Sequence, residues 1–308
     1  MNMHYDFIPD IHGQLHKLIP LLQTLGYAAV GSTWRHPEGR KVVFLGDYVD
    51  RGPSVREVLH LVRGMVDAGD ALAIMGNHEF NLVCYYTPDG DGGWLRKHSD
   101  RYVSQNAATR AAFEGREEEL RDWLEWMKRL PVALDLGGVR AVHACWDAAM
   151  IRKLPVGCFT DPAFLQAAAK SGTPERFARE MVLNGPEVAL PNGQKFMDKE
   201  GHSHDKSRIR WWGRNEDSSL GEVIMPLPDD RWKHVPLSDA AKFVVNYAPD
   251  EPPVFFGHYW MPADAPKKPA APNVACLDFS AGLRGPLVAY RWDGEQSLAE
   301  ERFVMPPE

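Results

Sequence analysis

Cysteine is scarce in this sequence of 308 residues, which contains only four: Cys84, Cys145, Cys158 and Cys276. No two of them form a Cys-x-x-Cys pair, and their spacing fits neither a disulfide framework nor a zinc ribbon. A chain of this length buries enough apolar surface to fold without covalent cross-links. We therefore expect reduced thiols that are mostly buried.

Long apolar runs are missing as well. No stretch reaches the roughly 18 consecutive apolar residues that a membrane-spanning helix needs. The N-terminus has no basic region, and Asp6 and Asp10 stand where a secretory signal would carry its apolar run. These absences predict a cytoplasmic protein with no membrane partner.

Positive charge is in deficit, with 35 Lys and Arg against 42 Asp and Glu and a net charge of −7. Such a balance disfavours nucleic acid as a partner, because that binding depends on neutralising phosphates. Hydrophobic residues make up 44% and charged residues 25% of the chain. These shares are ordinary for globular proteins and exclude a disordered, collagen-like or coiled-coil chain.

The first 80 residues repeat one pattern, in which a short apolar run is followed by a polar loop and then by an amphipathic segment. The apolar runs are residues 5–9, 41–45 and 71–75, and residues 15–25 and 55–66 have helical periodicity. Strand–loop–helix units predict an α/β fold with crossover helices. The loops then lie at the carboxyl ends of the strands, where open α/β sheets bind ligands.

The regularity weakens after Phe80. A further helix is expected at 117–129, and further strands at 132–136, 139–144, 254–256, 273–278, 287–292 and 302–305. Few clean periods occur between 145 and 250. We expect one domain spanning residues 1–308, with rim or cap elaborations at about 81–138 and 145–250.

Chemically reactive side chains follow the apolar runs. They are two carboxylates, one amide and three imidazoles: Asp10, His12, Asp47, Asn77, His143 and His258. Mixed oxygen and nitrogen ligands suit the divalent ions of Mn, Fe, Co, Ni or Zn. Six side chains exceed the needs of one catalytic ion and suit two ions that share a bridging carboxylate.

The order of the motifs is more specific than any one of them. DIHG at 10–13, GDYVDRG at 46–52 and GNHE at 76–79 follow each other along the chain. Taken alone, an Asp50–Arg51 ion pair could simply hold a loop together, and Asn77 could simply cap a strand end. The ordered set, with two later strand-end histidines, favours a metal centre over these separate structural explanations.

With VHA at 142–144 and GH at 257–258, the set resembles the calcineurin-like metallophosphoesterases. Within them it resembles the phosphoprotein-phosphatase-type branch, which is related to bacterial diadenosine tetraphosphate hydrolases and RNA-repair phosphatase modules. The resemblance covers about residues 5–80, with anchors at 139–144 and 254–280. It implies two mixed sheets packed face to face, flanked by helices.

The resemblance also implies roles for the strand-end residues. One divalent ion would be held by Asp10, His12 and Asp47, and a second by Asp47, Asn77, His143 and His258. Asp47 would bridge the two ions. Manganese is the first expectation, with Fe, Ni, Co or Zn as alternatives. A hydroxide bound by both metals would attack phosphorus in line.

Other residues would handle the substrate. By the same resemblance, Arg51 would grip the phosphate, and His78 would protonate the leaving oxygen while Asp50 orients its imidazole. Residues 208–214 would supply a second phosphate-binding arginine, Arg210 or Arg214. The arginines and tryptophans of that segment could also stack on a nucleobase, or the tryptophans could simply be buried. Asp278 would lie near the metals or be an ordinary strand-end cap.

The implied function is metal-dependent hydrolysis of a phosphoric ester. A phosphomonoester is the first expectation, on a phosphoprotein or a small phosphorylated metabolite. The alternatives are a dinucleoside polyphosphate or another phosphodiester, and removal of an RNA-end phosphate, which the acidic charge disfavours. A rival of another class is a non-catalytic scaffold of the same fold. Such a scaffold would have no chemical use for Asp50, Arg51 and His78.

Overall fold

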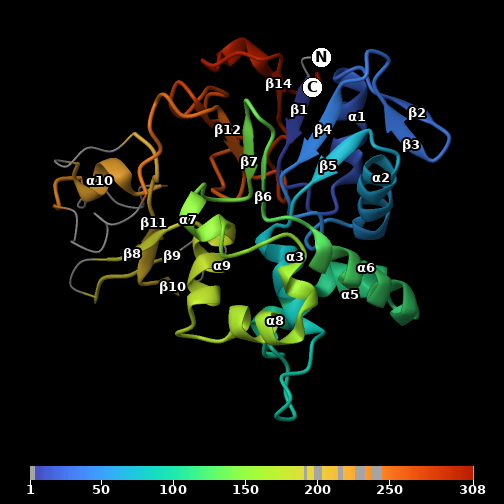
Figure 1. Ribbon diagram of the computed structural model, residues 1–308, viewed down its shortest axis with the longest axis vertical. Coiled ribbons are helices and arrows are strands. Elements are labelled where there is room, and N and C mark those ends of the chain that lie inside the picture. Colours follow the sequence, from blue (N-terminus) through green and yellow to red (C-terminus); the bar gives the residue numbers. More distant parts are fainter. Residues whose placement is uncertain are drawn as a thin grey trace.

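The computed structural model describes residues 4–190, 193–197, 203–213, 218–225, 233–236 and 245–307. Two larger sheets form its centre (Figure 1). Among the described residues, no helix is both long enough and apolar enough to cross a membrane. The four cysteines are free thiols; three are buried and Cys158 is half-buried, as expected.

The first sheet has the strand order β15-β14-β1-β4-β5. Its strands are β1 (Tyr5–Ile8), β4 (Lys41–Phe44), β5 (Ala71–Ala73), β14 (Ala289–Trp292) and β15 (Phe303–Val304). The three N-terminal strands run parallel, whereas β14 is antiparallel to β1 and to β15. The expected strand–loop–helix units therefore form one half of a mixed sheet.

The second sheet has the strand order β13-β12-β7-β6. Its strands are β6 (Ala133–Asp135), β7 (Arg140–Val142), β12 (Val254–Phe256) and β13 (Val274–Cys276). Strand β12 is parallel to both neighbours, and β6 and β7 form the expected antiparallel hairpin. The β6–β7 hairpin and the strands β12 and β13, which follow it by more than a hundred residues, thus share one sheet.

The two sheets pack face to face. One buried cluster joins Phe7 and Val43 of the first sheet to Ala141 and Phe255 of the second. The Phe7 and Phe255 rings stack with their centroids 4.1 Å apart. Successive strand residues point to opposite faces of a sheet. Ile8, Val42 and Phe44 therefore lie on the outer face of the first sheet, where they belong to the same buried cluster as residues of α1 and α2. The expected arrangement of two mixed sheets packed face to face is confirmed.

Helices cover the outer faces. α1 (Leu15–Thr24) and α2 (Val55–Asp67) flank the first sheet, and α3 (Asn77–Tyr85) begins directly below β5 (Figure 1). The apolar side of α2 is buried because Val55, Val58 and Val62 recur at helical spacing. α6 (Glu117–Arg129) has the bounds that the sequence predicts and packs on α3.

Shorter elements surround this frame. They are β2 (Ala28–Val30), β3 (Thr33–Arg35), α4 (Asp100–Gln105), α5 (Ala107–Ala112), α7 (Ala148–Ile151), η1 (Cys158–Thr160), α8 (Pro162–Ala169), α9 (Pro174–Asn184), β8 (Glu187–Ala189), β9 (Phe196–Met197), β10 (Ser203–His204), β11 (Lys206–Arg208), α10 (Leu220–Val223) and η4 (Glu300–Arg302). In Figure 1, α8 and α9 lie beyond the carboxyl ends of the parallel strands. The 145–250 segment therefore contains helices that its weak periodicity does not reveal.

Trp211 and Trp212 cover the outer face of the second sheet. Both are fully buried, and each lies about 5 Å from the Phe256 ring. Such burial disfavours the interpretation of these two tryptophans as platforms for a nucleobase. Their interpretation as buried core residues is confirmed.

Candidate functional site

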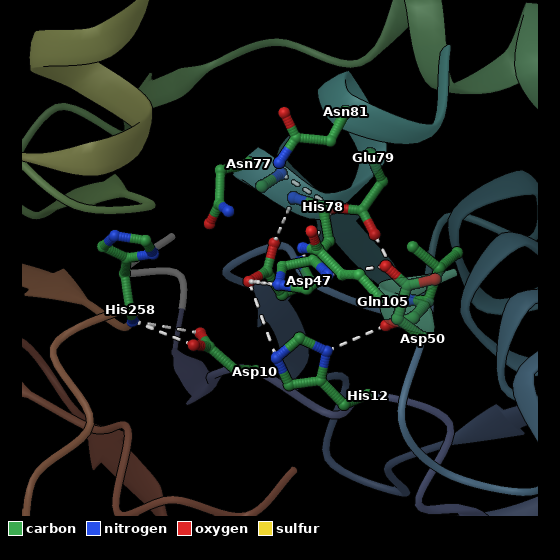
Figure 2. Close-up of polar contacts among 12 residues, drawn as sticks. Asp10, His12, Asp47, Asp50, Asn77, His78, Glu79, Asn81, Gln105 and His258 are labelled. Carbon is green, nitrogen blue, oxygen red and sulfur yellow. Dashed lines mark hydrogen bonds and ion pairs between the residues drawn. The ribbon is translucent and has the colours of Figure 1, made fainter. Parts of the chain in front are cut away.

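The six strand-end side chains come together where strands of both sheets end. Each follows a strand directly or by a few residues, and all six are buried: Asp10 and His12 after β1, Asp47 after β4, Asn77 after β5, His143 after β7 and His258 after β12. The two sheets therefore contribute to one cluster because their carboxyl ends meet at the same edge. Figure 2 shows most of this cluster.

Asp47 lies at its centre. Its Oδ2 atom is 3.6 Å from His12 Nε2, 3.5 Å from His143 Nε2 and 4.0 Å from His78 Nε2. Two groups of potential metal ligands share this carboxylate: Asp47 with His12 and His78, and Asp47 with His143 and His258. The shared position is the one that a bridging ligand needs.

Asp10 and Asn77 complete the cluster. Asp10 accepts a hydrogen bond of 2.9 Å from the backbone N–H of His258. Asn77 Oδ1 lies 2.9 Å from His143 Nε2. The structure therefore brings the six side chains close to one another, and their roles as metal ligands stay predictions.

The histidines have the protonation pattern of metal ligands. His12 Nδ1 and His143 Nδ1 each donate to a backbone carbonyl at 2.8 Å, those of Val49 and Leu45. This bond holds a proton on Nδ1 and turns Nε2 of each ring toward the cluster. Within the described chain, the buried Nε2 atoms of His12 and His258 have no hydrogen-bond partner. Divalent cations would satisfy these atoms, so the residues present fit such ions.

The electrostatics agree with this fit. Burial lowers the pKa of His12 and of His258 well below the ordinary value, which keeps both imidazoles neutral and able to bind a cation. Burial also opposes a proton on His143, but the Asp47 carboxylate outweighs it and raises the pKa of His143 to about 10. A positive charge beside Asp47 is thus favoured, whether carried by a proton or by a metal.

The loops that hold the cluster have unusual backbone angles. Positive φ values of 47° to 67° occur at His12, Asp47, Asp50, Arg51 and His258. Residues other than glycine rarely adopt this region, and such residues gather at functional sites. Neighbouring glycines allow the tight approach: a Cβ atom on Gly257 would lie 2.1 Å from Asp10 Oδ1.

Glu79, the last residue of the GNHE motif, fixes the GDYVDRG loop. It is fully buried, and its carboxylate accepts the backbone N–H groups of Asp47 and Tyr48 at 2.8 Å and of Gly76 at 2.9 Å. The sequence alone predicts no role for Glu79, although its place in the GNHE motif is a signal that points to it.

His78 and Asp50 form a buried pair beside the cluster. His78 Nδ1 lies 2.6 Å from Asp50 Oδ2. Burial lowers the pKa of His78, but Asp47 and the hydrogen bond to Asp50 outweigh burial, and the net pKa is raised. His78 therefore holds a proton more firmly than a free imidazole, which suits a general acid.

Thr109 of α5 holds the other oxygen of Asp50. Its hydroxyl donates to Asp50 Oδ1 at 2.6 Å and accepts from the Asp50 backbone N–H at 2.9 Å. Thr109 is fully buried. Nothing in the sequence marks it, because it lies 59 residues beyond Asp50 in a helix of ordinary composition.

We expect Thr109→Val to lower kcat about tenfold, because Asp50 would lose one anchor and hold His78 less firmly. Thr109→Ser keeps the hydroxyl and should retain most of the activity. Steady-state kinetics of both variants, with circular dichroism as the control for folding, check this expectation. Equal losses in the serine and valine variants would contradict it.

Arg51 lies at the edge of the cluster. Its guanidinium stacks over the Trp260 ring at 4.0 Å. Burial is the main cause that lowers the pKa of His12, and the positive charge of Arg51 adds to this effect. For His78, the same charge opposes the net rise of the pKa. This location suits the phosphate-binding role, which stays a prediction.

Asp278 lies beside Asp10. Its carboxylate accepts the backbone N–H groups of Trp260 and Ser280, each at 2.9 Å. Burial, followed by the charge of Asp278, raises the pKa of Asp10 well above its ordinary value. Asp278 is therefore both a strand-end cap and a neighbour of a proposed ligand.

The arginines of the 208–214 segment have different surroundings. Arg208 Nη1 lies 3.3 Å from the backbone carbonyl of His258, whereas Arg210 lines a cavity with Trp212, Met261 and others. Arg214 lies outside the described residues. The structure thus brings Arg208, a residue that the sequence did not single out, against the cluster. Arg210 as a substrate-binding residue stays a prediction.

Comparisons with known proteins agree with this geometry. The family model described as "Calcineurin-like phosphoesterase" matches residues 3–148. The cold-active protein-tyrosine phosphatase of a psychrophilic Shewanella species superposes with a TM-score of 0.50 over 94% of this chain and 75% of that chain. At 17% identity, this likeness shows a common fold only.

Curated relatives share the N-terminal part. The bis(5′-nucleosyl)-tetraphosphatase PrpE of Halalkalibacterium halodurans is 42% identical over 83 residues, 27% of this chain and 34% of that protein. The protein of the same name from Oceanobacillus iheyensis is 31% identical over 143 residues, 46% of this chain and 55% of that protein. The match thus spans between a third and about half of these relatives. Residues 3–148 thus match the calcineurin-like phosphoesterase family that the sequence motifs predict.

Proposed function

We propose that this protein is a metal-dependent phosphoric ester hydrolase with two ions in its active site. The observation that carries the proposal is the position of Asp47 between two groups of ligands, next to the His78–Asp50 pair. A non-catalytic scaffold would not need a proton donor at that place. We also propose that residues 1–308 form one domain.

The proposed ligand sets are those that the family resemblance implies. Asp10, His12 and Asp47 would hold one ion, and the other would be held by Asp47, Asn77, His143 and His258. Manganese is our first proposal, because oxygen and imidazole ligands suit it, with Fe, Ni, Co or Zn as alternatives. Such ions lower the pKa of bound water and stabilise charge on phosphoryl oxygens.

Side chains of the protein would bind the phosphate and protonate the leaving group. Arg51 would bind two phosphoryl oxygens through its planar guanidinium. Asp50 would hold the Nδ1–H of His78, so that the Nε2–H points at the leaving oxygen. As the bond from phosphorus to that oxygen breaks, the proton passes from His78 to the leaving group.

We consider two substrate classes, phosphomonoesters and nucleotide anhydrides. The sequence alone favours a phosphomonoester, but both curated relatives are named as tetraphosphatases of dinucleosides. These names support a dinucleoside polyphosphate or another nucleotide anhydride as the substrate of this chain. The same metal cluster and arginine would serve either class.

A hydrolysis screen tests the proposal. The purified chain is stripped of metal, reloaded with Mn, Fe, Ni or Zn, and assayed on an aryl phosphate, an aryl phosphodiester, a phosphopeptide and diadenosine tetraphosphate. We expect turnover that depends on metal and is greatest on diadenosine tetraphosphate. Stoichiometric metal binding without turnover of any substrate would favour the scaffold instead.

A further inference from the structure

Arg96 joins two amide side chains close to the His78–Asp50 pair. Its Nη1 donates to Asn81 Oδ1 at 2.6 Å, and its Nη2 donates to Gln105 Oε1 at 3.0 Å. The Tyr102 ring supports the guanidinium from 3.8 Å. One cation therefore fixes amides that belong to two helices, α3 and α4.

This contact fixes which way both amides face. Arginine has only donors, so the amide oxygens must turn toward Arg96 and the amino groups must turn away. Within the described chain, neither amino group donates a hydrogen bond to another residue. Asn81 and Gln105 are both half-buried, which leaves their N–H donors open to a ligand.

The location of these donors points to their use. Asn81 follows His78 by three residues on α3, so both lie on the same side of that helix. Gln105 ends α4, next to the helix whose Thr109 holds Asp50. In Figure 2, both amides lie toward His78 and Asp50 rather than toward His258. A leaving group that accepts the His78 proton would therefore extend toward them.

We propose that Asn81 and Gln105, held by Arg96, form a subsite for a leaving group that itself carries phosphate. Amino donors beside a guanidinium bind anionic oxygens well, whereas a simple alcohol would have little use for them. The substrate class would then be a phosphoanhydride, such as a nucleoside oligophosphate. Water would add to the attacked phosphorus, the P–O–P bond would break, and the departing phosphate would take the His78 proton. This inference rests on the proposed function.

The test uses the double variant Asn81→Asp with Gln105→Glu. Both changes keep an oxygen for Arg96 and replace the amino donors by carboxylate oxygens, which also adds two negative charges. We expect the ratio of kcat/KM for diadenosine tetraphosphate to kcat/KM for 4-nitrophenyl phosphate to fall about 10- to 100-fold, mainly through KM. Gln23→Glu, an exposed change on α1, adds one negative charge away from the cluster and should leave the ratio as it is.

A binding measurement separates this inference from the proposed function. Calorimetry follows the binding of the non-hydrolysable β,γ-methylene analogue of ATP to the wild type and to the double variant. We expect Kd to rise at least about tenfold in the variant. If binding and the substrate ratio both stay the same, the amides only support Arg96 and the subsite is overturned. An inactive wild type whose binding still depends on the amides would refute the proposed function alone. A wild type that cleaves the aryl ester but neither cleaves the dinucleotide nor binds the analogue would refute the subsite alone.

Discussion

Replacing Asp47 by asparagine should lower hydrolysis about a thousandfold or more and reduce the metal content of the protein. Asp47 is the carboxylate that both groups of potential ligands share, so its loss would weaken both proposed ion sites at once. Asparagine has nearly the same shape and tolerates the positive φ of 56° at this position, so the loop should keep its conformation.

The measurement is activity together with metal analysis by mass spectrometry after reloading. Asp67→Asn, at an exposed position on α2, is the matched control and should keep both the activity and the metal. Full activity in Asp47→Asn would show that the reaction does not use this cluster. Full metal content with lost activity would show that Asp47 does not hold the ions.

Replacing Asp50 by asparagine should lower kcat about a hundredfold and change the pH profile. Asp47 and Asp50 raise the pKa of His78 against the effect of burial. A general acid works only while protonated, so activity that depends on His78 is present below its pKa and is lost as pH rises through it. Removing the Asp50 charge lowers that pKa, and the alkaline limb of kcat/KM should move to lower pH.

The measurement is a pH–rate profile of the wild type and of the variant, with the same metal loaded. His78→Asn gives the reference, because it should remove the alkaline limb that His78 sets. A limb that stays at the same pH in Asp50→Asn would contradict the assignment of His78 as the acid. An unchanged kcat would contradict the role of Asp50 as its partner.

The centre of the fold and the composition of the cluster could be predicted from the sequence. Strand ends in α/β sheets place their following residues at one edge, so Asp10, Asp47 and Asn77 could be expected together. His143 and His258 lie much further along the chain. The signal that groups them with the others is that each stands at the end of an apolar run. In the structure, Asp47 lies close to both histidines, Asp10 accepts the backbone N–H of His258, and Asn77 lies against His143.

The helices between 145 and 250 could not be predicted from hydrophobic periodicity, but capping signals were present. Asp161 before Pro162 and Thr173 before Pro174 each cap a helix through the side chain. The helices α8 and α9 that follow are short, so few apolar positions repeat. A capping residue followed by proline therefore marks the first residue of both helices.

The residues that support the site could not be predicted, because their positions depend on tertiary contacts. Thr109 acts on Asp50, and Arg96 orients Asn81 and Gln105, only because loops and short helices bring them together. No spacing in the sequence encodes such a contact. The approach of Arg208 to the His258 carbonyl has the same cause, because it depends on how β11 lies against His258.

Anomalous diffraction from crystals grown with manganese would locate the two proposed ions directly. We expect two anomalous peaks, one on either side of Asp47. One peak should lie near Asp10 and His12, and the other near His143 and His258. A single peak, or peaks away from Asp47, would contradict a two-metal centre that this carboxylate bridges.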